Sequence, residues 1–400
     1  MVETADFLVL GAGVIGLNIA RELAERHKGS RIVVLEKEQS LGAHASGRNS
    51  GVLHAGFYYT ADSLKAKFTR DGNREMTSFC DTRGLRINKC GKLVVARDES
   101  ELSGLETLLQ RGRANGVDLH RITAKEAKEI EPRVKTCQYA LYSPTTSSVD
   151  PCEVMSALGK EANSNGVDLR FGEKYLGFKS GRVITSRGAY ACGYVVNAAG
   201  LFADRVARDF GFSQGYYLLP FKGLYLYSDE PAGELSTHIY PVPNLAHPFL
   251  GSHFTVAVDG HIKIGPTAIP AFWREQYTWR DNFNLQELVE TAWRQVGLLF
   301  NAGFDFNRLA VEELHKYYRP YLVAQTTALA EGVRVGDYKT WGKHGIRAQL
   351  VRKDTKSLEM DFVLEGDKKS IHVLNAVSPA FTCSIPFSQY VVDRIADFVR

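Results

Sequence analysis

The chain has 400 residues, of which 44% are hydrophobic and 24% are charged, and its formal net charge at pH 7 is +4. This length allows two domains of ordinary size, and the composition is that of a globular protein. The charge is too small and too dispersed to indicate nucleic-acid binding. The six cysteines are scattered without a Cys-x-x-Cys pair, which argues against a disulfide framework or a zinc site and favours a reducing compartment.

The N-terminal region predicts a complete βαβ unit. An apolar strand that starts at Asp6 leads into a Gly-x-Gly-x-x-Gly turn, a helix is expected over 17–26, and a strand over 31–35 ends at an acidic residue. The glycines permit a tight turn, close approach of backbone N–H groups to a pyrophosphate, and helix packing on the strand. Phosphates bind at such helix N-termini, and the acid is placed to accept hydrogen bonds from a ribose. A glycine turn without a ligand is the alternative. The expected dinucleotide contacts are Gly11, Gly13, Val14, Ile15, Gly16, Glu36 and Lys37.

A glycine-studded segment, residues 42–56, follows this unit and continues into Phe57, Tyr58 and Tyr59. Its small residues let the backbone run close to a flat or charged group. A fold that binds only a nicotinamide cofactor would continue with another βα unit. This segment is therefore the first indication of a flavin.

The remaining elements are predicted from periodicity and turn residues. Helices are expected over 64–83, 100–115 and 285–300, and Asn284 with Glu287 resembles a capping box for the last of these. Strands are expected over 92–96, 194–200 and 371–374, and a final helix follows. Residues 143–148 form a turn-rich break between domains, and 216–269 have the texture of an antiparallel sheet.

This order predicts an α/β plus α+β fold, in which a substrate domain is inserted into a discontinuous Rossmann-like cofactor domain. We assign residues 1–85, 145–215 and 340–400 to the cofactor domain. Residues 86–144 and 216–339 form the substrate-binding domain, which is built on an antiparallel sheet. The first strand leaves no room for an uncleaved signal or transit segment, and no apolar run approaches the roughly 20 residues that cross a bilayer. We therefore expect a cytoplasmic protein.

Several segments together carry a resemblance to a known family: 46–59, 63–67, 90–96, 220–223, 239–243, 248–255, 345–349 and 375–380. On these motifs the chain resembles the glutathione-reductase-like flavoproteins of the D-amino-acid-oxidase superfamily, and within them the L-2-hydroxyglutarate dehydrogenases, also described as oxidases. Family members often have His at the position of Arg48, Arg at that of Lys222 and an acid at that of Leu224. Residues 320–345 match the family least well.

The resemblance implies FAD as cofactor and the oxidation of an L-2-hydroxy acid to a 2-keto acid by hydride transfer. Such a reaction needs a base for the hydroxyl proton and cations for the carboxylates. We expect His54 as the base, with His253 second, because a neutral imidazole suits this role. Arg347 is expected to clamp the substrate carboxylate. Other expected substrate contacts are Lys222, Tyr58, Tyr59, Tyr240 and Gln349. Further expected FAD contacts are Ser46, Asn49, Ser50, Gly51, Val52, Gly200, Ser378, Pro379 and Ala380. No metal is expected.

Two other functions remain open, namely an amine or amino-acid oxidase of the same superfamily and a non-catalytic flavin-binding electron carrier. The partners are a small dicarboxylate or 2-hydroxy-acid substrate and an electron acceptor, whether quinone, oxygen or a carrier. The apolar helix over 285–300, with Trp279, Trp293 and the run 315–319, raises the hypothesis of peripheral contact with the inner membrane. An apolar stripe at this spacing is more often part of a core.

Overall fold

The structure is a computed structural model, which describes residues 2–243, 251–301 and 306–400. Its first large sheet is mostly parallel and has the strand order β10-β11-β12-β1-β2-β9, with β22 also paired to β12 and β21 to β22. The strands are β1 (Val2–Leu10), β2 (Ile32–Glu36), β9 (Asp168–Phe171), β10 (Tyr175–Lys179), β11 (Arg182–Thr185), β12 (Ala189–Asn197), β21 (Val363–Gly366) and β22 (Ser370–Asn375). The predicted N-terminal βαβ unit is confirmed, because β1 and β2 are parallel neighbours joined through α1 (Val14–Arg26).

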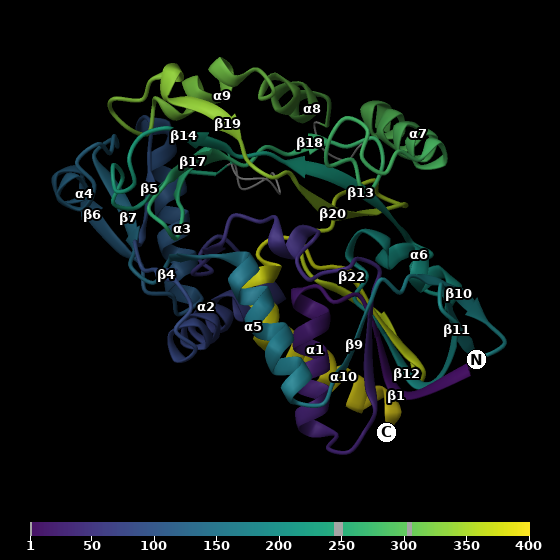
Figure 1. The fold of residues 1–400 in the computed structure, drawn as a ribbon. Helices are drawn as coiled ribbons and strands as arrows, with labels where there is room; N and C mark the ends of the chain where they lie inside the picture. Colours follow the sequence, from purple (N-terminus) through teal and green to yellow (C-terminus); the bar gives the residue numbers. More distant parts are fainter. Residues whose placement is uncertain (1, 244–250, 302–305) are drawn as a thin grey trace.

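Helices cover this sheet with a continuous apolar core. Helix α1 packs against α5 (Pro151–Ser164) and α10 (Ala380–Val399), and α10 packs in turn on α2 (Leu64–Thr82) (Figure 1). Fully buried Leu17, Leu158 and Phe387 belong to the same hydrophobic cluster. The helices predicted over 64–83 and 100–115 are confirmed as α2 and α3 (Leu102–Ala114).

The second large sheet has the strand order β19-β14-β17-β16-β15-β5-β7-β6. Its strands are β5 (Lys92–Val95), β6 (His120–Thr123), β7 (Tyr139–Ser143), β14 (Leu226–Ser228), β15 (His238–Pro241), β16 (His253–Val256), β17 (Ile262–Gly265) and β19 (Tyr338–Trp341). The antiparallel texture predicted for 216–269 is confirmed, and one parallel pair, β5 with β15, joins the earlier strands to the later ones. Helices α4 (Ala124–Ile130) and α9 (Arg319–Thr326) accompany this sheet.

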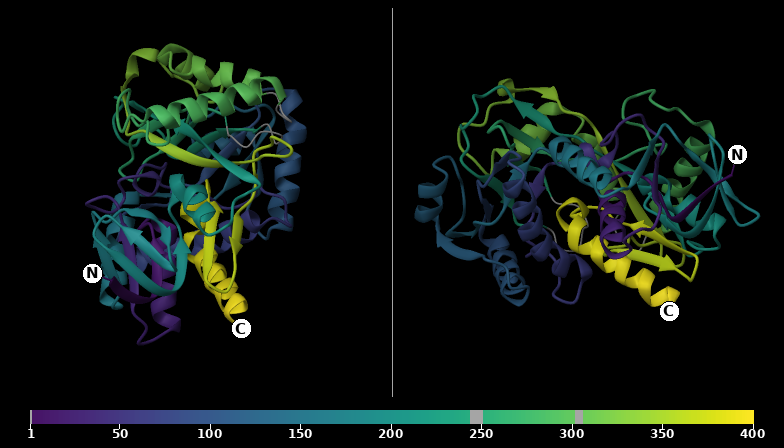
Figure 2. Two further views of the ribbon diagram at one scale, coloured as in Figure 1. Left: turned by 90° about the vertical axis from the view of Figure 1, so that its right-hand side faces the viewer. Right: turned by 60° about the horizontal axis from the view of Figure 1, so that its bottom comes forward.

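A three-stranded antiparallel sheet lies between these two parts. Its long strands β13 (Tyr216–Gly223) and β20 (Gly345–Arg352) pair along their whole length, and β18 (Ile269–Pro270) adds to β13. Helices α7 (Leu285–Asn301), α8 (Phe306–His315) and α9 lie beyond these strands, on the side away from the parallel sheet (Figures 1 and 2). The remaining short helix α6 (Ala203–Asp209) follows β12. Among the described residues, no helix is both long and apolar enough to span a membrane.

Two local predictions can be compared with the structure in detail. The turn predicted within 143–148 is present and joins β7 to β8 (Ser147–Val149), where Ser147 and Ser148 are buried. Strand β8 pairs with β3 (Val52–Leu53) and β4 (Ile87–Asn88) in a small separate sheet.

The capping box expected at the start of α7 is only half present. The Asn284 side chain accepts a hydrogen bond from the Glu287 N–H at 3.0 Å, as predicted. The Glu287 carboxylate does not return this bond. It accepts from the Arg274 N–H at 3.0 Å and pairs with Arg205 at 2.6 Å, because these donors pack against it in the fold.

Candidate active site

A cavity of about 800 Å³ opens where the parallel strands end. Its walls come from the turn after β1, the end of β2, the glycine-studded segment, residues 198–202, β20 and the start of α10. Clefts at the carboxyl ends of parallel strands are the usual ligand sites of such sheets. The volume lies in the range of cofactor and small-molecule sites.

The turn between β1 and α1 leaves no room for side chains. Gly11 has φ +104°, and a Cβ there would lie 2.6 Å from the Ala198 carbonyl oxygen. A Cβ on Gly16 would collide with the Gly11 carbonyl, so Gly16 packs the helix against the turn and does not line the cavity. The first N–H of α1, that of Val14, donates to Ser46 Oγ at 2.9 Å. The N-terminus of α1 therefore faces the cavity with its partial positive charge, which suits a pyrophosphate.

Glu36, the acid predicted to bind a ribose, lies at the end of β2. Its carboxylate accepts hydrogen bonds from the N–H groups of Ala12 and Glu38, both at 3.0 Å. These two bonds hold the carboxylate at the cavity wall. Each carboxylate oxygen retains acceptor capacity, so ribose hydroxyls have a place to donate.

The glycine-studded segment lines the cavity on a second side through Ser46, Asn49, Ser50 and Val52. The Asn49 amide, however, is used within the loop, where it donates to Ser46 O at 2.8 Å and accepts from Gly51 N–H at 2.8 Å. Gly51 does not line the cavity. It has φ +76° and packs against Val149 O, so its role is to let the loop meet β8.

The opposite walls also fit a flat cofactor. Gly200 has φ +52° and lines the cavity with its backbone, because it has no side chain. Residues Ser378, Pro379 and Ala380 line it at the N-terminus of α10. A helix N-terminus there favours electron-rich carbonyl groups.

His54 and Arg347 line the same cavity, although 293 positions of sequence separate them (347 minus 54). The His54 backbone N–H donates to Thr382 Oγ1 at 3.2 Å, and its side chain is half-buried. Burial, followed by repulsion from the nearby Lys92 ammonium, lowers the pKa of His54 well below its ordinary value. The imidazole is therefore neutral and able to accept a proton.

Arg347 extends from β20 and donates to the Thr267 carbonyl oxygen at 2.8 Å. Burial lowers the pKa of Arg347 from its ordinary value, but a guanidinium stays charged in proteins. Its planar group can bind a carboxylate through two hydrogen bonds.

The second large sheet has one apolar face and one polar face around strands β5, β15, β16 and β17, and both faces are buried there. A row of side chains crosses four adjacent strands, since Lys92 pairs with His238 and Thr255 with Lys263. The opposite face holds Leu93, Ile239, Phe254 and Ile264 in an apolar core. The row of four is at most 5% exposed. Because charged groups are rarely buried without a partner, we treat this polar face as a candidate ligand-binding surface.

His253 belongs to the same face. Its ring stacks on Tyr240 with a centroid distance of 3.6 Å, and its Nδ1–H donates to Gly251 O at 2.7 Å. This bond leaves Nε2 unprotonated and able to accept a proton. Burial lowers the pKa of His253 to about 3. Unlike His54, His253 does not line the cavity.

The other expected substrate contacts divide into two groups. Tyr58 and Tyr240 lie at the polar face, with their rings 4.6 and 4.9 Å from Lys92 Nζ. Like Tyr58 and Tyr240, the residues Tyr59, Lys222 and Gln349 do not line the cavity. The Tyr59 ring lies against Lys65 of α2, and the Gln349 amide donates to Glu359 O at 2.7 Å.

Lys222 of β13 does not line the cavity, although its neighbour Gly223 and its cross-strand partner Ile346 do. Lys222 is buried and interacts electrostatically with Asp281. The replacement of the family's usual arginine by Lys222 therefore lies outside the cavity.

Sequence analysis missed Lys92, Lys263 and Tyr225. Tyr225 lines the cavity, and Lys263 Nζ donates to the Ser50 carbonyl oxygen at 2.9 Å. A lysine within a short apolar strand normally points to solvent. Only the buried position of the sheet shows that these two point inward, so alternation alone could not identify them.

Two other histidines are hydrogen-bonded within the protein. His238 accepts a hydrogen bond from Val256 N–H at 3.0 Å and supports the sheet. His44 bonds to Glu38 at 2.9 Å and to Tyr277 at 2.6 Å. His247 lies outside the described residues.

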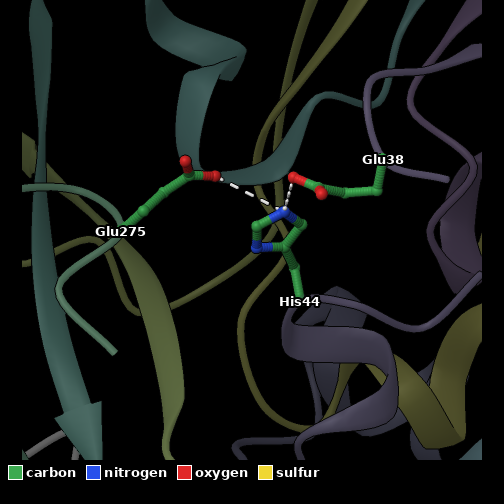
Figure 3. Close-up of side chains that lie close together, drawn as sticks. All are labelled: Glu38, His44 and Glu275. Atoms are coloured by element: carbon green, nitrogen blue, oxygen red, sulfur yellow. Dashed lines mark hydrogen bonds and ion pairs between the residues drawn. The ribbon is translucent and has the colours of Figure 1, made fainter. Parts of the chain in front are cut away.

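The ligand atoms of Glu38, His44 and Glu275 lie within 4.8 Å of one another and have the chemistry of a metal site (Figure 3). However, Lys37 Nζ lies 2.6 Å from both carboxylates. One ammonium group thus offsets part of the negative charge of this pair. We interpret the cluster as a salt-bridge network that ties the loop after β2 to the segment after β18.

Comparisons with known proteins agree with this geometry. The model of the family "FAD dependent oxidoreductase" matches residues 6–394. L-2-Hydroxyglutarate dehydrogenases from Escherichia coli and from Nematostella vectensis are 34% and 36% identical over 98% and 99% of this chain, and over 93% and 91% of their own lengths. The chain belongs to the L-2-hydroxyglutarate dehydrogenase family.

Comparison with solved structures confirms that the chain has the fold of the FAD-dependent oxidoreductases, with mixed α/β sheets. FAD-bound L-α-glycerophosphate oxidase from Mycoplasma pneumoniae has a TM-score of 0.76 at 21% identity, covering 98% of this chain and 95% of its own. FAD is the cofactor. The glycine turn, the helix N-termini and Glu36 form a cradle that fits its pyrophosphate and ribose.

Proposed function

We propose that this chain oxidises L-2-hydroxyglutarate to 2-oxoglutarate. The names and identity of its relatives support this assignment. The structural observation that carries it is the cavity itself, which runs from the dinucleotide-binding turn to His54 and Arg347. One cavity thus joins a cofactor cradle to a neutral imidazole and a carboxylate-binding cation.

We assign the chemical roles as follows. Bound FAD supplies the hydride acceptor. Arg347 binds the carboxylate next to the hydroxyl-bearing carbon, which orients that carbon in the cavity. The neutral His54 imidazole accepts the hydroxyl proton, and His253 is the second candidate for this role.

We further propose that the cofactor-binding part is of the glutathione-reductase type, with residues 1–85, 145–215 and 340–400 in it and 86–144 and 216–339 in the substrate-binding part. The support is that β1, β2, β9, β12 and β22, which come from all three cofactor segments, share one sheet. Strand β20 pairs with β13 along its length and thereby ties the two parts together.

Anaerobic mixing of the FAD-loaded protein with single substrates tests the function. L-2-Hydroxyglutarate should bleach the visible flavin absorbance, whereas D-2-hydroxyglutarate and L-glutamate should not. Reduction by L-glutamate but not by the hydroxy acid would indicate an amino-acid oxidase. A protein that no 2-hydroxy acid or amino acid reduces would be an electron carrier, and either result would refute the proposal.

We also propose that the protein docks on the inner membrane through α7 and transfers its electrons there, to a quinone or a carrier. The apolar stripe of this helix was expected to be core, but Leu285, Val289 and Trp293 are 63%, 61% and 78% exposed, and nearby Trp279 is 80% exposed. Leu285, Val289 and Trp293 are four residues apart and so share one face of the helix, and exposed apolar side chains that gather on one face favour an interaction site. Sedimentation with lipid vesicles tests the docking. Protein that remains in the supernatant would contradict it and favour oxygen as acceptor.

A further inference from the structure

Lys92 lies at one end of the polar row, and burial without a counter-ion lowers its pKa to about 7. The side chain is fully buried, and its Nζ has no hydrogen-bond partner within the described ranges. Three aromatic rings surround the ammonium, those of Phe57 and Tyr58 at 4.6 Å and that of Tyr240 at 4.9 Å. Ring faces attract a cation, but they do not replace the hydrogen bonds that its three N–H groups lose on burial.

The hydroxyl groups near Lys92 have unused hydrogen-bonding capacity. That of Tyr58 is buried without a hydrogen-bond partner in the described part of the chain, and those of Tyr240 and Thr255 interact with each other. An ammonium group and nearby hydroxyl groups that are free to donate are complementary to a ligand that only accepts hydrogen bonds. A carboxylate meets this requirement, and its negative charge offsets the cost of burying the cation.

The other lysine of the row does not have this open capacity. Lys263 Nζ donates a hydrogen bond to the Ser50 carbonyl oxygen and thereby holds the glycine-studded segment against the sheet. Lys92 and Arg347, by contrast, lie on different sheets, and both of their charges act on His253. Two positively charged side chains from different sheets thus lie near His253. This arrangement suits a ligand with an anionic group at each end.

We propose that Lys92, together with the hydroxyl groups of Tyr58 and Tyr240, binds the substrate carboxylate farther from the hydroxyl-bearing carbon and so selects dicarboxylates over monocarboxylates. This inference rests on the proposed function, in which Arg347 binds the nearer carboxylate. It makes Lys92 a specificity-determining residue, with no part in proton or hydride transfer.

The test compares the FAD-loaded wild type with Lys92→Met, which keeps the length and apolar stem of the side chain without its charge. Binding of two unreactive ligands, glutarate and its monoamide glutaramate, is followed by calorimetry. The wild type should bind glutarate at least about 100-fold more tightly than glutaramate, because an unpaired buried charge is costly. In Lys92→Met this ratio should fall to within about fivefold, through weaker glutarate binding.

A matched control is Lys65→Met on α2, which removes a lysine that is also buried, at 6% exposed, but lies outside the polar face. It should keep the wild-type ratio. If Lys92→Met does not retain FAD, Lys92→Gln provides the same comparison with a neutral hydrogen-bond donor, and a reduced ratio is again expected.

Kinetics separate this inference from the proposed function. With L-2-hydroxyglutarate, Lys92→Met should raise KM strongly and leave the rate of flavin reduction at saturation within about fivefold of wild type. Wild type that is not reduced by L-2-hydroxyglutarate would refute the proposed function. Wild type that is reduced, with a Lys92→Met variant that keeps its glutarate preference or loses the saturating rate, would refute the role of Lys92 alone.

Discussion

The buried ion pair between Asp204 and Arg274 provides the strongest test of how the cavity is held together. Asp204 belongs to α6 and Arg274 to the segment after β18, and they are 0% and 2% exposed. The guanidinium binds the carboxylate through two hydrogen bonds of 2.6 and 2.9 Å. Arg274 also precedes Glu275, which lines the cavity and pairs with Lys37. The ion pair therefore links α6 to one wall of the cofactor site.

Asp204→Asn keeps the shape of the side chain but leaves the Arg274 charge buried without its counter-ion. Breaking such a pair costs about 3–5 kcal/mol. The expected result is a decrease of this size in the free energy of unfolding, measured by chemical denaturation, together with faster loss of FAD. Asp393→Asn is the control, because its pair with Arg26 has side-chain exposures of 60% and 36% and such surface pairs contribute at most about 1 kcal/mol. Equal effects of the two substitutions would refute the reasoning.

Three further predictions concern the site. His54→Ala should keep FAD but slow flavin reduction by about 10²–10⁴-fold in anaerobic stopped-flow, the usual contribution of a general base; a rate within tenfold of wild type would remove His54 from this role. Gly11→Ala should lower the FAD content of the purified protein, because its Cβ would lie 2.6 Å from Ala198 O at φ +104°; full flavin occupancy would contradict this. Since burial lowers the pKa of His253 to about 3 and that of His54 well below its ordinary value, both rings stay neutral as the pH falls. The pH profile of kcat/KM should therefore show no loss between about pH 7 and 5, and a midpoint near 6.5 would indicate an exposed histidine as base.

Local patterns predicted those parts of the fold whose signals are contained in short segments. The glycine turn, Glu36 and the amphipathic helices are of this kind, because tight turns and helix faces depend on neighbouring residues. The parallel pairing of β5 with β15 could not be predicted, since nothing near Lys92 specifies that His238 lies beside it. The exposure of Trp293 could not be predicted either, because the sequence pattern of an apolar helix face is the same whether or not another element covers that face.

Local motifs predicted the glycine turn and Glu36, and the family resemblance pointed to His54 and Arg347. In the structure all of these border one cavity. Which other strand residues reach that cavity depends on tertiary packing. Lys222 and Gln349 lie outside it, although Arg347 on the same strand as Gln349 lines it, and Lys92 and Lys263 lie in a buried row. Alternation along a strand separates two faces, but it does not specify which face packs against the rest of the molecule or which residues of that face border a cavity. Those contacts form only when the sheets pack together.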